Sequence, residues 1–122
     1  MLNQTNEVFE QFAADIPGFV AASLVDLDSG MTLAVKSMRG DFDLAISSSY
    51  NIELVKQKMK IIKALNLKTT LEDIILTLGD QIHFIKVLSP TLFLYLAADR
   101  STANIAIVRT VVNRNSHRMG TT

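Results

Sequence analysis

The stretch of sequence that decides the fold runs from Leu71 to Asn113 and reads LEDIILTLGDQIHFIKVLSPTLFLYLAADRSTANIAIVRTVVN. Three apolar runs, at 71–78, 81–88 and 92–98, are separated only by Gly-Asp and Ser-Pro-Thr, which are typical of tight turns. The residues that follow, 102–114, change to the three- and four-residue spacing of a helix. The stretch therefore predicts an antiparallel meander of three strands followed directly by a helix.

The residues before this stretch predict a further hairpin between two helices. Apolar residues recur at three- and four-residue steps in 3–15, which indicates a short amphipathic helix. Strands are expected at 19–27 and 31–36, joined by a turn that contains Asp28, Ser29 and Gly30. Both strands are apolar almost throughout, so we expect the sheet to be covered on both faces.

A long helix is predicted between the hairpin and the meander. Asp41 and Asp43 are its candidate N-caps, and it continues to about Asn66 with no proline or glycine inside it. One stripe of this helix is apolar, and lysines lie on another face. The one basic concentration of the chain consists of Lys56, Lys58, Lys60, Lys63 and Lys68. We interpret it as a solvated face whose cations suit the C-terminal helix dipole; the alternative is a docking face for an acidic partner or a phosphate.

The predicted order of elements places the chain in the α+β class. Five strands joined by tight turns form one five-stranded antiparallel sheet, with the long helix on one face and the two terminal helices on the other. With 122 residues, the chain is long enough for one domain with a core and too short for two. We expect a single domain over 1–115 and, over 116–122, a flexible tail that has nothing to bury.

The composition excludes several classes of function. Twelve basic and twelve acidic residues give a formal net charge of zero, so the chain has no overall attraction to nucleic acid or to an anionic membrane. The absence of cysteine excludes disulfides, thiolate metal sites and a thiol nucleophile. The N-terminus MLNQTNEVFEQF has no basic start and no export signal, and no apolar run has the length of a membrane span. We expect a cytoplasmic protein without membrane insertion.

One phrase of the sequence invites an enzymatic interpretation. Asp26 and Asp28 follow an apolar strand, which resembles the nucleophile motif of haloacid-dehalogenase-type phosphatases. Such an enzyme needs a second carboxylate about four residues after the aspartate of a later Gly-Asp pair, and that position is Phe84. The two histidines, His83 and His117, are interpreted as surface or packed residues. We therefore interpret the phrase as a turn and expect no catalytic residue, no bound metal and no cofactor.

Three phrases of the sequence resemble the segments that connect helices and strands in a known protein family. They are VDLDSG at 25–30, between the first two strands; FLYL at 93–96 with Asp-Arg at 99–100, at the last strand; and NIAIVR at 104–109, at the start of the last helix. Together with the order of elements over 6–114, these phrases resemble the roadblock family, named from the dynein light chain and shared with bacterial regulators of Ras-like GTPases. The fold that this resemblance implies is roadblock/profilin-like.

The resemblance also implies a homodimer and a set of interface residues. In the family the second helices pair across a two-fold axis, and the third strands join edge to edge into one sheet. An exposed edge as rich in isoleucine and leucine as 71–78 is an aggregation hazard unless something covers it, and a symmetric partner strand does so. Small side chains in the helix let a second helix approach closely. The residues assigned to this dimer or partner interface are Ala45, Ser48, Ser49, Ile52, Val55, Ile74, Ile75 and Leu76.

The function implied by the resemblance needs no catalysis by this chain. We expect a non-enzymatic homodimeric regulator or scaffold of a small Ras-like GTPase, which in some members of the family promotes GTP hydrolysis. The alternatives are a pure assembly subunit of a larger complex, as in motor complexes, and a small-molecule sensor, since related five-stranded folds hold ligands beside the sheet.

Overall fold

The computed structural model of the chain describes residues 2–40 and 43–119, and at residues 2, 3, 45 and 46 it describes the backbone alone. The order of elements confirms the predicted α+β class. In chain order they are α1 (Leu2–Asp15), β1 (Phe19–Asp26), β2 (Thr32–Ser37), α2 (Leu44–Ala64), β3 (Asp73–Thr77), β4 (Gln81–Ser89), β5 (Leu92–Asp99), α3 (Ile105–Asn115) and the short 3-10 helix η1 (Ser116–Arg118).

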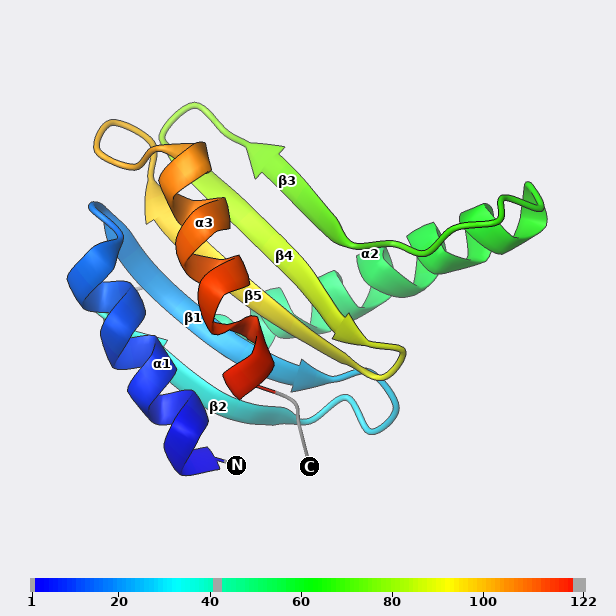
Figure 1. Cartoon of the computed structure of the whole chain (residues 1–122), viewed down its shortest axis with the longest axis horizontal. Helices are drawn as coiled ribbons and strands as arrows, with labels where there is room; N and C mark the ends of the chain where they lie inside the picture. The colour runs from blue at the N-terminus through cyan, green and yellow to red at the C-terminus, as the bar shows by residue number, and fades with distance from the viewer. Residues whose placement is uncertain (1, 41–42, 120–122) are drawn as a thin grey trace.

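The strands form one antiparallel sheet in the order β2-β1-β5-β4-β3, which Figure 1 shows with α1 and α3 on the near face and α2 behind. The central strands β1 and β5 are buried along almost their whole length. They are also the pair that joins distant parts of the chain, with Ser23 opposite Tyr95. The remaining strands, β2 and β3, are the two edges of the sheet.

The face that carries α1 and α3 is closed by apolar packing. Phe9 and Phe12 of α1 and Val112 of α3 meet the sheet around Leu96 in one buried cluster. Apolar residues three and four apart bring the α1 side chains to the same side of the helix. Each large side chain buried in this way contributes roughly 1.5–3 kcal/mol to folding.

Ion pairs at the rim of this closed face connect its elements. They join Lys36 to Glu10 at 2.9 Å, Arg109 to Asp73 at 3.3 Å, Arg114 to Asp15 at 3.5 Å and Arg118 to Glu7 at 3.1 Å. Because these pairs lie at the surface, each contributes on the order of 0–1 kcal/mol, and packing is the main source of stability.

The opposite face of the sheet is crossed by α2 alone. Leu44 and Val55 of α2 pack on Phe93 and Ile85 of the sheet. Val55 is the last buried residue of the helix, and residues 56–81, all of which the structure describes, include no buried side chain. Figure 1 shows why, because the C-terminal half of α2 extends beyond β3 and past the edge of the sheet.

Two expectations about coverage need correction. β2 is not covered on both faces, because it is an edge strand and its Val35 side chain is 56% exposed. Residues 116–119 are not a loose tail, because η1 returns the chain to the closed face and Met119 is buried in its core, 1% exposed. The rest of the expected tail, 120–122, lies outside the described residues.

The caps of the two later helices explain where those helices begin. Asp43 stands at the N-cap position of α2, since its carbonyl accepts a hydrogen bond from Ser47 N at 3.2 Å. The other candidate, Asp41, lies outside the described residues. The Asn104 side chain accepts hydrogen bonds from the backbone N–H groups of Ala106 and Ile107, at 2.8 and 3.3 Å. The last helix therefore begins at residue 105, three residues later than predicted.

Candidate protein-protein interface

The two edges of the sheet differ in how they are protected. The register between β1 and β2 shifts at Leu24 and Val25, and such an irregularity protects an edge from further pairing. β2 also carries Lys36, which is paired to α1. In contrast, β3 pairs with β4 without a shift, and no described strand lies on its other side. β3 is therefore the edge that is open for pairing with another strand.

Side chains of β3 alternate between the two faces of the sheet. Ile75 lies opposite Phe84 and packs on the closed face, whereas Ile74 lies opposite Ile85 and packs on the α2 face. By alternation, Leu76 is also on the α2 face, where it is 37% exposed. Of the three predicted strand residues, Leu76 thus offers the most surface to a partner, and both isoleucines are partly buried in their own chain.

One stripe of α2 faces the sheet of its own chain. Leu44, Ser48, Asn51 and Val55 recur at helical spacing, and all of them are buried. Ser48 is 3% exposed, and its hydroxyl has no hydrogen-bond partner among the described residues. Ser48 and Val55, both predicted for the interface, therefore lie against their own sheet in the single chain.

The other helix residues predicted for the interface are not brought together. Ile52 is partly buried beside the β1–β2 turn. The Cδ1 atom of Ile52 would lie 3.9 Å from a Cβ placed on Gly30 of that turn. Ser49 is exposed. The side chain of Ala45 lies outside the described residues. The predicted helix set therefore does not form one continuous surface.

The sequence interpretation missed a second apolar stripe on α2. Tyr50, Leu54, Ile61 and Leu65 recur four, seven and four residues apart, centred about 100° around the helix from Val55. Tyr50 is 73% exposed, and Leu65, just past the last residue of α2, is 64% exposed. Their helical spacing is visible in the sequence and could have predicted this second stripe. With Leu76 of β3, these residues make up the open apolar surface: Tyr50, Leu54, Ile61, Leu65 and Leu76.

A polar pair lies where this α2 stripe meets β3. The Tyr95 hydroxyl is 3.2 Å from Nδ1 of His83, and Nε2 of His83 is 2.7 Å from Oε1 of Gln81. The two rings meet edge to face, with centroids 5.3 Å apart. Ser47 of α2 hydrogen-bonds Tyr95, and Leu76 lies opposite His83 in the sheet. The helix and strand parts of the open apolar surface thus approach each other at this pair.

Burial keeps both members of this pair uncharged at neutral pH. It raises the pKa of Tyr95 to about 12, while the hydrogen bond with Ser47 acts in the opposite direction. Burial lowers the pKa of His83 from its usual value, and the carboxylate of Asp80 opposes this shift. A neutral pair is compatible with an apolar contact next to it.

The carboxylate that invited an enzymatic interpretation is used inside a turn. Asp26 accepts hydrogen bonds from the backbone N–H of Asp28 at 3.1 Å and from the hydroxyl of Ser29 at 2.8 Å. Gly30 closes the turn with a positive φ of 74°, which favours glycine. In the part of the chain that the structure describes, no three histidine or carboxylate side chains come together as a metal site.

Within residues 2–40 and 43–119, no helix combines the length and the apolar character that crossing a bilayer requires.

Proteins of known structure share this fold. A Roadblock/LC7 domain from Streptomyces avermitilis superposes with a TM-score of 0.79 at 13% identity, over 91% of this chain and 90% of that chain. Myxococcus xanthus MglB gives 0.85 at 14% identity, over 97% and 86% of the two chains. An MglB with a tetrameric arrangement gives 0.81 at 17% identity, over 94% and 84%. No protein-family model and no curated protein matches the sequence. The chain therefore has the roadblock fold, as its sequence phrases predicted.

Proposed function

We propose that this chain is a homodimeric regulator or scaffold of a small Ras-like GTPase. The observation that carries the proposal is the open apolar surface, on a fold shared with MglB and Roadblock/LC7 domains. In a single chain Tyr50, Ile61 and Leu65 are exposed to water. Several exposed apolar side chains along one side of a helix are typical of contact sites between proteins.

The proposed dimer uses two contacts that fit one two-fold axis. The β3 strands of the two chains pair antiparallel, which satisfies the free backbone N–H and C=O groups of the open edge. α2 extends beyond β3 (Figure 1). In the proposed dimer, the exposed stripe of α2 would reach across the strand pair to the sheet of the partner. The tetrameric arrangement of a solved MglB supports self-association of this fold.

The GTPase part of the proposal rests on the resemblance to the roadblock family and on the fold shared with MglB. In this proposal the dimer contributes no reacting group. It binds one conformation of the switch loops of the GTPase more tightly than another. The shift that it produces is limited by the difference between those two affinities.

The dimer is tested first, by sedimentation equilibrium at micromolar concentration. We expect twice the chain mass of 13.5 kDa. A single-chain mass under these conditions would remove the basis of the proposal.

The GTPase is tested by capture from a lysate of the native host on the tagged chain, in GTP- and GDP-loaded states, followed by single-turnover hydrolysis assays. A faster hydrolysis rate in the presence of the chain supports a regulator. Binding without a change in rate supports an assembly subunit. Retention of no Ras-like GTPase in either state contradicts the proposal.

A further inference from the structure

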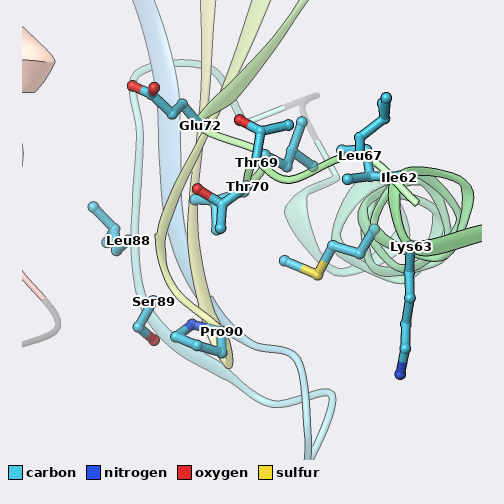
Figure 2. Close-up of a pocket in the computed structure, with 12 residues that line it drawn as sticks. Ile62, Lys63, Leu67, Thr69, Thr70, Glu72, Leu88, Ser89 and Pro90 are labelled. Carbon is cyan, nitrogen blue, oxygen red and sulfur yellow. The ribbon is translucent and has the colours of Figure 1, made fainter. Parts of the chain in front are cut away.

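A groove of about 520 Å³ lies between the overhanging end of α2, the connector that follows it and the β4–β5 turn. Figure 2 shows Leu88, Ser89 and Pro90 on one side and Ile62 and Leu67 on the other. Its volume is in the range of sites that bind small molecules or inserted side chains. The apolar walls of the groove are formed mainly by Met59, Ile62, Leu67, Leu71, Val87 and Leu88.

The charged residues that line the groove are Lys63 of α2 and Glu72 of the connector, and two further lysines share the Lys63 side of the helix. Lys56, Lys60 and Lys63 are four and three residues apart, which places them on one side of the helix, and Lys63 lines the groove. They lie on the opposite side of α2 from Leu54 and Ile61. The segment 56–72 contains five lysines and one glutamate, so a neutral chain concentrates positive charge here.

These lysines differ from most of the other cations of the chain. Of the seven lysines and arginines outside 56–72, five pair with a carboxylate, and among the described residues Lys86 and Arg100 do not. Among the described residues, no ion pair includes any lysine of the segment 56–72. In contrast, each of the following cations lies 2.9–3.5 Å from a carboxylate oxygen: Lys36, Arg39, Arg109, Arg114 and Arg118.

The positive charge on this side of α2 is not neutralised by ion pairs among the described residues. Like charges four residues apart on a helix repel each other. The helix dipole favours cations in the last turn, and of the α2 lysines only Lys63 lies there. Carboxylates supplied from outside would remove the repulsion between Lys56 and Lys60.

We propose that this groove binds an acidic peptide segment of a partner protein. Apolar side chains of the segment enter the groove, and its carboxylates pair with Lys56, Lys60 and Lys63. A peptide fits better than a membrane surface, because the apolar side chains line a concave groove, which inserted side chains reach and a flat bilayer does not. The inference goes beyond the proposed function, since this binding needs neither the dimer nor a GTPase.

The test measures fluorescence anisotropy of labelled synthetic peptides with the full-length chain. The probe peptide carries leucines and glutamates at helical spacing. One control peptide has lysine in place of each glutamate, and another has alanine in place of each leucine. We expect only the probe peptide to bind, with an affinity that falls as salt is raised.

Two matched triple variants locate the binding site. Replacing Lys56, Lys60 and Lys63 together by glutamine should weaken binding about tenfold, the size expected for three exposed charge contacts. A control triple that makes the same change in charge on the closed face should bind as the unmodified chain does. It consists of Lys36→Gln, Arg114→Gln and Arg118→Gln.

A groove variant separates shape from charge. Leu67→Asp places a carboxylate at the exposed groove wall and should abolish binding of the probe peptide, whereas Leu67→Met should retain it. Leu67 is 51% exposed, so both variants should fold.

Four results would overturn the inference. The first two are no binding of the probe peptide and equal weakening of binding by the two triple variants. The third is preferential binding of the chain to phosphatidylserine vesicles. The fourth is dissociation of a dimer by the α2 triple variant, which would make the lysine side a contact between copies. A monomeric chain that still binds the probe peptide would contradict the proposed function and leave this inference supported.

Discussion

The two faces of the sheet are covered in different ways. On the closed face, α1, α3 and Met119 bury one continuous core, and ion pairs connect the elements at its rim. On the other face, α2 crosses the sheet, has its last buried residue at Val55 and then extends past the edge of the sheet (Figure 1). The stability of one chain therefore depends mainly on the closed face, whereas exposed apolar side chains remain on the α2 face.

The largest effect is expected on the closed face. Phe12→Ala removes a fully buried ring. The centroid of this ring lies 5.9 Å from the ring centroid of Phe9 and 6.4 Å from that of Phe19. The substitution should lower the free energy of unfolding by about 3–5 kcal/mol, measured by urea denaturation at fixed protein concentration. The control is Ile107→Ala, an apolar truncation at an exposed position of α3, which should cost less than about 1 kcal/mol. Equal losses in the two variants would contradict the assignment of stability to the closed-face core.

The second effect is expected on association. Leu76→Lys places a charge on the open apolar surface and should weaken the proposed dimer by about 2 kcal/mol or more, roughly thirtyfold in Kd. Sedimentation velocity over a dilution series measures this change. The control is Thr77→Lys, because Thr77 is the next residue of β3, is exposed and points to the other face. If Thr77→Lys dissociates the dimer and Leu76→Lys does not, the α2 face is not the contact.

A smaller effect is expected at the cap of α3. Asn104→Ala removes the side chain that accepts hydrogen bonds from Ala106 and Ile107, and it should cost about 1 kcal/mol in thermal unfolding. Asn104→Ser, which keeps a capping oxygen, should recover most of this loss. Neither variant should change the dimer Kd, since α3 belongs to the closed face. A changed Kd would show that the two faces are coupled.

The smallest effect is a pH dependence at the His83–Tyr95 pair. Burial lowers the pKa of folded His83, so below about pH 6.5 the unfolded chain binds a proton that the folded chain does not. Stability should therefore fall as pH is lowered from 7 to 5. His83→Gln should reduce this slope in urea denaturation, whereas His117→Gln, at an exposed position, should retain it. An unchanged slope in His83→Gln would contradict this account.

The order of elements could be predicted because turn residues separate the apolar runs. The strand predicted at 81–88 is observed as Gln81–Ser89, and the one at 92–98 as Leu92–Asp99. The same order of elements predicted that α2 lies on one face of the sheet and that α1 and α3 lie on the other. These features depend on local sequence, which determines strand length and turn position.

The exposed side chains of α2 could not be fully predicted, because this helix has two apolar stripes. The stripe with Ser48 and Val55 and the stripe with Leu54 and Ile61 both have helical spacing, and only the position of the sheet decides which one is buried. The burial of Met119 could not be predicted either, because it also depends on tertiary packing. Three polar residues precede it, and the core that it joins is formed by distant segments of the chain.

The overhanging half of α2 should also differ from the rest of the molecule in hydrogen exchange. Beyond Val55, no residue of the helix is buried, so its backbone hydrogen bonds open without unfolding the sheet. In a single chain the amides of 57–64 should therefore exchange with solvent much faster than those of β1 and β5. In the proposed dimer a second chain covers these turns and should slow their exchange. The exchange rate at a few amides would then report how much of the protein is dissociated.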